Sequence, residues 1–363
     1  MHSFTRGLNP RNKTSVICNS PYAFFVWKAV RYARRLKGSF WLVLANRKAT
    51  VPGVIIRRVC KPALVIQDCR ELYLFKEVKR LSGKIGCFFE RMMVQRADIV
   101  MCANQERCTL LQMEYNLSQT PIPYENLRML EYESEKKLED AKKRLDSCFH
   151  DDEIRIISSS GCSVLRTNDV LVKNLNKVEK KCRLFLVGDS SLYEKHIIEG
   201  IVEEKHLKNV EIIGRLNQTE LKYLISKCHI GIVNYGKYDT NNLLCASGKL
   251  YEFLYEGLPV VTTENPPLKR ICLCFGIGIA DDSYYNGINM VINQYEEYKN
   301  RLEIYTNATS IKDNDKQLIE KIRDLASIKL SGHVASARRN EYHKYFAWFY
   351  SIYFNMLYFV QRG

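Results

Sequence analysis

The feature that most constrains the fold is a regular alternation of apolar runs, rich in β-branched residues, with segments of helical character. In the second half of the chain such runs lie at 154–160, 183–188, 210–215, 230–235, 258–263 and 276–280. Helical segments between most of them lie at 170–181, 193–204, 218–227 and 249–256. Apolar strands that alternate with helices are typical of a parallel sheet covered on both faces. The second half therefore predicts a doubly wound α/β domain.

The first half of the chain repeats this rhythm with fewer strands. Strands are predicted at 14–19, 39–45, 63–67 and 98–103, and helices at 22–36, 53–60, 72–95 and 105–115. A charged stretch, 132–152, is interpreted as a solvated helix and linker. Since a chain of 363 residues exceeds the size at which one core keeps growing, two domains are expected.

We place the domains at 1–146 and 147–335. The remaining segment, 336–363, is rich in aromatic residues between Tyr345 and Val360. We expect it to form a helix that packs back on the first domain. A helix lying in a membrane interface is the alternative.

Positive charge is concentrated in the first hundred residues. They hold 20 lysines and arginines against 5 acidic residues, and the first acidic residue is Asp68. The whole chain has 55 basic and 40 acidic residues, so the other 263 residues carry 35 of each. Basic clusters at 31–37, 57–61 and 76–80 have apolar neighbours, typical of helices that lie on an anionic membrane. A nucleic-acid groove is the alternative, but no nucleic-acid-binding module is recognisable, so this partner is not expected.

Composition and motif content exclude several classes of protein. Charged residues make up 26% of the chain and hydrophobic residues 46%, which excludes a disordered protein. No apolar run reaches the roughly 18–20 residues of a membrane-spanning helix, and no signal peptide is expected. The 13 cysteines include no C-x-x-C, and the 7 histidines lack metal-binding spacing, so reduced thiols and no metal site are expected. The absence of a Walker A loop argues against a kinase-like ATPase.

The segment most informative about function is 241–261. Ser247 has the properties of a helix N-cap, and Gly248 lets a ligand approach the backbone closely. Lys249 and Glu252 follow one turn apart on the polar stripe of the predicted helix. A helix N-terminus with a lysine in its first turn suits a diphosphate, and a glutamate one turn later suits a ribose diol. An ordinary capped helix with solvated charges is the alternative.

This segment resembles the donor-site signature of retaining GT-B glycosyltransferases, especially glycosyltransferase family 4. The shared pattern is a small-residue loop, then Lys-Leu-Tyr-Glu, an apolar turn and Gly-x-Pro-Val-Val. Further segments are similar to other parts of that family, in the same order, at 65–73, 97–104, 181–189, 210–216 and 276–280. The resemblance implies two Rossmann-like domains facing a cleft, the first for the acceptor and the second for a nucleotide sugar.

The resemblance also implies which residues meet each part of the donor. The diphosphate would be bound by Arg166, Ser247, Gly248 and Lys249, and the ribose by Glu252. The base would be met by Arg215 and Leu216, which follow a predicted strand. Arg166 could alternatively be a solvated loop residue.

Two positions depart from the family pattern. Leu244 stands where a second glutamate near the donor sugar is common, so the sugar is assigned to Asn241, Asn242 or backbone N–H groups. Arg70 stands where a histidine is common. The resemblance implies retention of configuration, and the departure at Leu244 leaves inversion open.

Asp68 and Glu71 are the candidate catalytic residues of the first domain. They follow the predicted strand 63–67 at its carboxyl end, where ligands sit in open α/β sheets. Either carboxylate could orient or deprotonate an acceptor hydroxyl. A structural turn, in which Arg70 pairs with one of them, is the alternative.

The implied reaction moves a hexosyl or N-acetylhexosaminyl group from a nucleoside-diphosphate sugar, UDP in preference to GDP. The acceptor would be a hydroxyl of a lipid-linked glycan in capsule or exopolysaccharide synthesis. Lys249, Arg166 and the helix N-terminus would meet the charge of the leaving diphosphate, so no metal and no other cofactor are expected. We expect a cytoplasmic protein held peripherally at the inner face of the cell membrane. The alternatives are a nucleotide-sugar epimerase with the same double-Rossmann frame, and a non-enzymatic protein that binds an anionic surface or nucleic acid.

Overall fold

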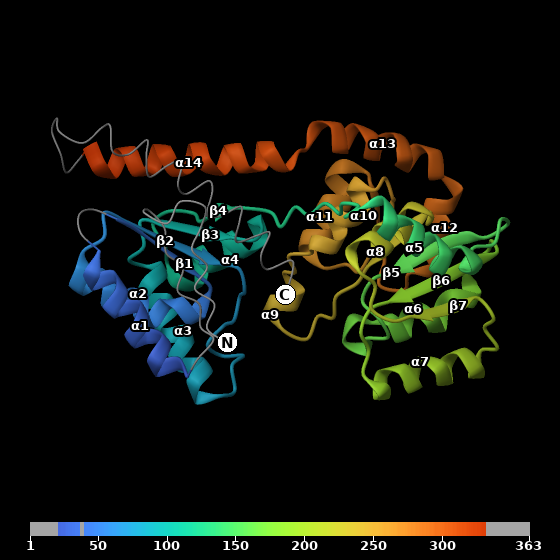
Figure 1. Cartoon of the computed structure of the whole chain (residues 1–363), viewed down its shortest axis with the longest axis horizontal. Helices are drawn as coiled ribbons and strands as arrows, with labels where there is room; N and C mark the ends of the chain where they lie inside the picture. The colour runs from blue at the N-terminus through green and yellow to red at the C-terminus, as the bar shows by residue number, and fades with distance from the viewer. Residues whose placement is uncertain (1–20, 37–39, 332–363) are drawn as a thin grey trace. The chain divides into compact units, whose positions relative to one another are not determined.

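The computed structural model describes residues 21–36 and 40–331, which fall into two compact units. Of these described residues, the first unit comprises those up to Tyr124 together with those from Lys312 onward, and the second comprises Glu125–Ile311. In the described residues each unit has one parallel β-sheet, of four strands in the first and six in the second (Figure 1). Two parallel-sheet α/β units confirm the predicted fold class.

The sheet of the first unit has the strand order β1-β2-β3-β4, and all its neighbours are parallel. The strands are β1 (Trp41–Ala45), β2 (Leu64–Cys69), β3 (Ile99–Cys102) and β4 (Ile122–Pro123). Every residue of β2 is buried. Because side chains alternate along a strand, Leu64 and Ile66 enter one core and Val65 enters the other. Helices must therefore cover both faces.

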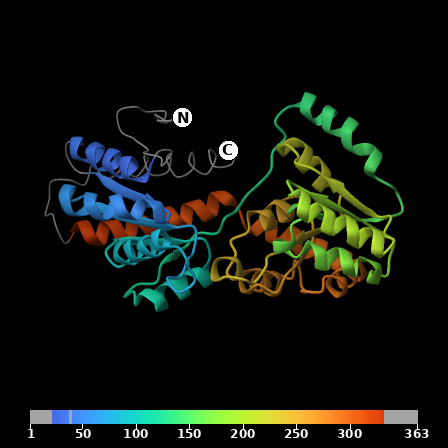
Figure 2. The same cartoon turned by 90° about the horizontal axis from the view of Figure 1, so that it is seen from below.

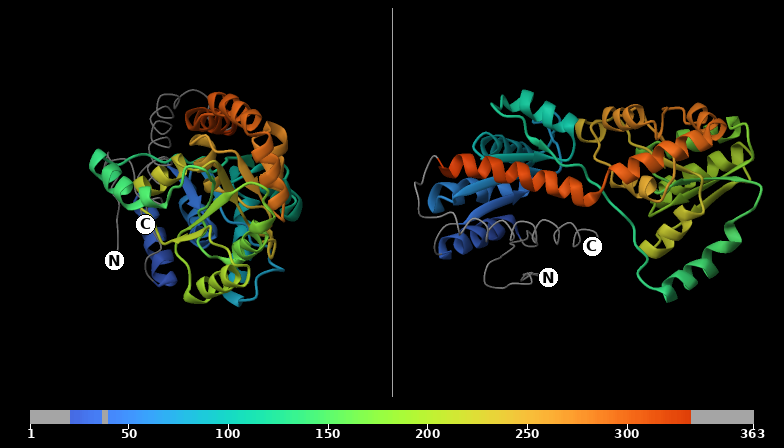
Figure 3. Two further views of the ribbon diagram at one scale, coloured as in Figure 1. Left: turned by 90° about the vertical axis from the view of Figure 1, so that its right-hand side faces the viewer. Right: turned by 90° about the horizontal axis from the view of Figure 1, so that it is seen from above.

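Helices do cover both faces of this sheet. One face carries α1 (Tyr22–Arg35), α2 (Thr50–Cys60) and α3 (Leu81–Val94), and α4 (Gln105–Tyr115) follows β3. The other face is covered by α14 (Ile311–Ser331), which buries Leu318, Ile319 and Ile322 against the strands. Figure 2 looks onto α1–α3, and the right-hand view of Figure 3 looks onto α14.

The sheet of the second unit has the order β10-β9-β8-β5-β6-β7, again with parallel neighbours. All six predicted strands are found, as β5 (Ile154–Ser158), β6 (Cys182–Val187), β7 (Val210–Ile213), β8 (Ile230–Val233), β9 (Val260–Thr262) and β10 (Gly278–Ala280). From β5 the chain builds the sheet outward to β7, then returns to place β8 on the other side of β5. Ligands of open α/β sheets bind at such a reversal.

Helices on both faces enclose this second sheet. They are α6 (Asn168–Asn174), α7 (Leu192–Glu204), α8 (Gln218–Ser226), the short α9 (Thr240–Leu243), α10 (Gly248–Tyr255), α11 (Pro266–Phe275), α12 (Tyr285–Asn293) and α13 (Tyr295–Ala308). Ile157 and Phe185 enter one core, and their strand neighbours Ile156 and Leu184 enter the other. In the described part of the chain no helix combines the length and the apolar character that crossing a membrane requires.

The observed division of the chain differs from the predicted boundaries of 1–146 and 147–335. Residues 125–146 lie with the second unit, because α5 (Glu135–Leu145) buries Ala141 and Leu145 in its core. The predicted solvated helix therefore has a narrow apolar stripe. Residues 312–331 lie with the first unit, because α14 covers its sheet.

One further prediction differs from the structure, and two others fall outside the residues that it describes. The helix predicted at 72–95 begins only at Leu81, since the residues before it, including the buried Leu72 and Leu74, lie outside regular secondary structure. The predicted strand at 14–19 lies outside the described residues. The predicted C-terminal helix within 336–363 also lies outside them.

We predict that Ile322→Ala lowers the free energy of unfolding by about 2–5 kcal/mol, because its buried side chain fills the core under α14. Urea denaturation of the full chain measures the loss. Ile304→Ala on α13 is the matched control, since Ile304 is 69% exposed and its truncation should cost less than about 0.5 kcal/mol. Equal losses in the two variants would contradict the placement of α14.

Candidate functional site

The candidate site lies in the second unit, where β5 and β8 end side by side. The loop after β5 carries Arg166, and the chain after β8 leads through α9 to α10. Because parallel strands end at one edge of a sheet, these two segments meet there. The Lys249 amine of α10 donates to the carbonyl of Ser159, at the start of the loop that carries Arg166. The structure thus brings together the two residues predicted for a diphosphate.

A buried polar network holds the ends of β5 and β8 in place. Ser160 Oγ donates to Asn234 Oδ1 at 2.8 Å, and Asn234 Nδ2 donates to Asn168 Oδ1 at 2.6 Å. Asn168 Nδ2 in turn donates to the carbonyl of Gly161 at 2.7 Å. This network could not be anticipated from the sequence, because serine and asparagine after a strand look like ordinary turn residues. Its side chains fix the loop that leads to Arg166.

The helix α10 begins as predicted. Ser247 is buried and is the N-cap, with its Oγ accepting a hydrogen bond from the N–H of Leu250 at 3.3 Å. Gly248 is the first residue of the helix, and a Cβ there would lie 3.2 Å from Asn126 Nδ2 and 3.3 Å from Arg128 Cδ. A larger residue would have to displace these side chains. The first turn of a helix carries partial positive charge, which favours an anion.

The Lys249 side chain connects the start of α10 to the end of β5. The amine donates to the carbonyl of Ser159, at the end of β5. Burial lowers the pKa of Lys249 to about 8, with the charges of Arg166 and Arg128 contributing to the shift and that of Glu252 opposing it. An anion bound here would favour the protonated amine.

Arg166 stacks on an aromatic ring at the end of β8. Its Cζ lies 3.8 Å from the centroid of the Tyr235 ring. Its Nη1 is buried and has no hydrogen-bond partner among the described residues. A buried donor without an acceptor costs about 1–3 kcal/mol, and a phosphate oxygen would remove that cost. Arg166 is therefore not a fully solvated loop residue, and its role as a phosphate ligand stays a prediction.

Glu252 lies one turn further along α10 and is only 3% exposed. Burial raises its pKa, while Arg128 and Lys249 lower it. Arg128 Nε lies 2.9 Å from Glu252 Oε1. Arg128 was not anticipated from the sequence, because it lies far from α10 along the chain in a stretch without a recognisable motif.

The residues predicted for the base lie after β7, and those predicted for the sugar lie on α9. Arg215 follows β7, its side chain is 74% exposed, and its Nη1 lies 3.6 Å from Asp189 Oδ2. Leu216 packs against the core of the second unit. Asn241 and Asn242 belong to α9, where Asn242 Nδ2 donates to Asp239 Oδ1 at 2.8 Å. The roles of these four residues stay predictions.

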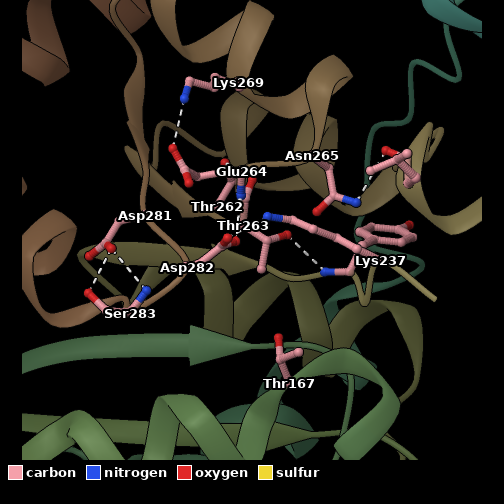
Figure 4. A network of polar contacts seen from close by, with 12 residues as sticks. Thr167, Lys237, Thr262, Thr263, Glu264, Asn265, Lys269, Asp281, Asp282 and Ser283 are labelled. Carbon is pink, nitrogen blue, oxygen red and sulfur yellow. Dashed lines mark hydrogen bonds and ion pairs between the residues drawn. The ribbon is translucent and has the colours of Figure 1, made fainter.

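A second polar network, not anticipated from the sequence, joins the loops after β8, β9 and β10 (Figure 4). Asn265 Nδ2 donates to the carbonyls of Asn242 at 2.9 Å and Leu243 at 3.2 Å, which ties α9 to the end of β9. Lys237 forms an ion pair with Asp282. These contacts hold the segment that leads into α10.

Asp68 and Glu71 lie in the first unit. Asp68 is buried near the end of β2, and its Oδ2 accepts a hydrogen bond from Arg70 Nε at 2.8 Å. The N–H of Glu71 donates to Asn46 Oδ1 at 3.3 Å. The structural turn weighed from the sequence is therefore present, with Asp68 as the partner of Arg70. A catalytic role for either carboxylate stays a prediction.

Metal-binding side chains do not gather in this site. Within 21–36 and 40–331 there is no group of three or more histidine, cysteine or acidic residues that could hold a metal ion. The cysteines of the described part are free thiols, most of them buried.

No known protein-family model matches the sequence, and no curated protein matches it. Solved structures do match it. Alr3699/HepE of Anabaena in complex with UDP has a TM-score of 0.63 at 14% identity, covering 83% of this chain and 82% of that chain. Sucrose-phosphate synthase of Thermosynechococcus elongatus has a TM-score of 0.61 at 16% identity, with coverage of 85% and 78%.

A third match is the UDP-GlcNAc 2-epimerase of Neisseria meningitidis bound to UDP-GlcNAc. Its TM-score is 0.50 at 14% identity, with coverage of 85% of this chain and 84% of that chain. At such identities the likeness concerns the fold. The two parallel-sheet units of this chain have the architecture of GT-B glycosyltransferase structures.

Proposed function

We propose that the protein is a glycosyltransferase that uses a nucleoside-diphosphate sugar. The observation that carries this proposal is the cluster at the start of α10, where the Lys249 amine donates to the carbonyl of Ser159 and interacts with the charges of Arg166 and of the buried Glu252. The fold shared with glycosyltransferase structures supports it. Because the Anabaena neighbour was crystallised with UDP, UDP is the nucleotide we assign in preference to GDP.

In this proposal the diphosphate lies across the first turn of α10. Lys249 and Arg166 bind its oxygens, and Glu252 accepts hydrogen bonds from the ribose hydroxyls. When the bond between the sugar and the diphosphate breaks, negative charge builds up on the leaving diphosphate, and the same two cations stabilise it. This electrostatic stabilisation comes from the chain itself, so the proposed reaction needs no metal ion. Arg215 and Leu216 are assigned to the base, and Asn241 and Asn242 to the sugar.

The sugar moved would be a hexosyl or N-acetylhexosaminyl group, transferred with retention to a hydroxyl of a lipid-linked surface glycan. Asp68 and Glu71 would orient that hydroxyl. Because Asp68 is buried and paired with Arg70, Glu71, which is less buried, is the better candidate for contact with an acceptor. Were the reaction inverting, Glu71 would be the candidate base for the same reason.

A nucleotide-sugar epimerase is the second candidate, because the Neisseria epimerase has a similar fold. Incubation with UDP-sugars in the absence of any acceptor separates the two functions. Epimerised donor would favour the epimerase. Unchanged or hydrolysed donor, with sugar transfer once vesicles carrying a lipid-linked glycan are added, would favour the transferase.

We also propose that the first unit lies on an anionic membrane surface, at the inner face of the cell membrane where a lipid-linked acceptor would be found. α1 exposes Phe24 and Trp27, whose rings are stacked with centroids 5.5 Å apart. Lys28 Nζ lies 4.7 Å from the centre of the Phe24 ring, and Arg31 Cζ lies 4.8 Å from that of Trp27. Exposed aromatic rings flanked by cations are typical of helices in a membrane interface. α3 adds exposed Leu81, Ile85 and Phe88.

We predict that UDP stabilises the wild-type protein against heat by about 2.7 kcal/mol at 100 times its dissociation constant. Lys249→Ala should lower UDP affinity by about tenfold or more, since a charge-assisted hydrogen bond contributes about 1.5–3 kcal/mol. Lys269→Ala is the control, since it removes the same charge from a lysine outside the proposed site. Lys269 lies on α11 and pairs with Glu264 at 2.7 Å. Full UDP stabilisation of Lys249→Ala would refute the site.

We predict that UDP affinity falls as the pH rises through about 8, the pKa to which burial lowers Lys249. The anion binds the protonated amine, so binding must take up a proton once the free amine is neutral. In Lys249→Arg the charge persists, and the affinity should not vary between pH 7 and 9. Isothermal titration calorimetry at several pH values measures both. The same fall in the two proteins would exclude Lys249 as its source.

We predict that Trp27→Ser weakens binding to vesicles rich in anionic lipid by about tenfold, because burying a large apolar side chain contributes about 1.5–3 kcal/mol. Co-sedimentation measures the bound fraction. Tyr193→Ser is the control, since Tyr193 is 75% exposed on α7 in the second unit. Equal weakening by the two substitutions, or equal binding to neutral vesicles, would contradict the membrane face.

A further inference from the structure

The stretch 125–134, which joins the two units along the chain, has no helix or strand and is fastened to α10 and its surroundings. Glu125 accepts a hydrogen bond from the hydroxyl of Tyr251 at 3.1 Å and pairs with Arg270 at 2.9 Å. Asn126 Nδ2 donates to the carbonyl of Ala246 at 3.4 Å, just before the helix. Arg128 therefore reaches the candidate site from an anchored segment.

Arg128 contacts the residue assigned to the ribose. Its Nε lies 2.9 Å from Glu252 Oε1, and the two side chains are 37% and 4% exposed. Burial alone would favour the neutral form of Glu252, and the permanent charge of the guanidinium opposes this. One carboxylate oxygen of the proposed ribose ligand is thus taken by a side chain of the protein.

The same side chain also runs along the start of α10. Arg128 Cδ would lie 3.3 Å from a Cβ placed on Gly248, the first residue of the helix. Its charge acts on Lys249, as does that of Arg166. Three cations therefore surround one helix N-terminus that also carries partial positive charge, while Glu252 supplies one negative charge.

We propose that Arg128 is a donor-binding residue that selects nucleoside diphosphates over nucleosides. This inference rests on the proposed nucleotide-sugar site. The ribose hydroxyls and Arg128 compete for the carboxylate of Glu252. A nucleoside must therefore displace the guanidinium from Glu252, and it brings no phosphate to serve as a new anionic partner for Arg128. A diphosphate on the first turn of α10 gives the guanidinium a new anionic partner beside its present position. The partly exposed side chain can then leave Glu252 to the ribose without losing an ion pair.

The test compares the affinities of UDP and uridine, measured by direct and displacement calorimetry. In Arg128→Gln, UDP affinity should fall about tenfold or more, whereas uridine affinity should stay within about threefold or rise, because its competitor is gone. Arg144→Gln is the matched control, since Arg144 of α5 forms an ion pair at 2.8 Å with Glu220 of α8 in the same unit. It should change neither affinity.

A structural role would give a different pattern. If Arg128 served only to hold Glu252 in place, Arg128→Gln would weaken UDP and uridine equally, and the proposal would be overturned. Unchanged UDP affinity would overturn it as well. Should Arg128→Gln not fold because Glu252 is left buried, the pair Glu252→Gln and Arg128→Gln/Glu252→Gln removes that problem. Adding Arg128→Gln to Glu252→Gln should still weaken UDP and spare uridine.

Failure of the proposed function looks different from failure of this inference. A folded wild-type protein that binds UDP no better than uridine has no diphosphate site, which refutes the proposed function itself. A wild-type protein that prefers UDP, with the same preference in Arg128→Gln, keeps the proposed function and refutes only the role of Arg128.

Discussion

The candidate site depends on one constraint of the second sheet, the reversal of strand order that makes β5 and β8 neighbours. The chain leaves these strands toward opposite sides, so the two loops that follow them open next to each other. The contacts among Ser160, Asn168 and Asn234 tie the loops together within a buried core. Lys249 then crosses to the carbonyl of Ser159 at the end of β5. The geometry of the cation cluster follows from this pairing of strands.

Electrostatics explains why this arrangement suits an anion. Lys249 and Arg166 are confined where water is scarce, so their repulsion is less screened than on a surface. Burial and the neighbouring cations lower the pKa of Lys249, and Arg166 Nη1 is buried without an acceptor among the described residues, so the site holds more positive charge and more donors than its own side chains satisfy. The carboxylate of Glu252 offsets part of this positive charge, and it already forms an ion pair with Arg128. A ligand that carries both a diphosphate and a diol would pair its phosphates with the cations and its hydroxyls with the carboxylate.

Local signals in the sequence predicted much of the fold, and long-range packing accounts for the differences. The six strands of the second unit and the start of α10 follow from apolar runs and from the capping pattern at Ser247 and Gly248. The return of α14 to the first sheet and the attachment of α5 to the second depend on tertiary contacts that no local pattern encodes. Arg128 was missed for the same reason. From the sequence alone, Arg70 could pair with either Asp68 or Glu71, and only the folded turn shows that Asp68 is the partner.

The most direct test is a crystal structure of the full chain with UDP. The account predicts that the diphosphate lies on the first turn of α10, within hydrogen-bond distance of Lys249 and Arg166, and that the ribose hydroxyls face Glu252. A nucleotide bound elsewhere in the second unit, or one whose phosphates point away from α10, would contradict it.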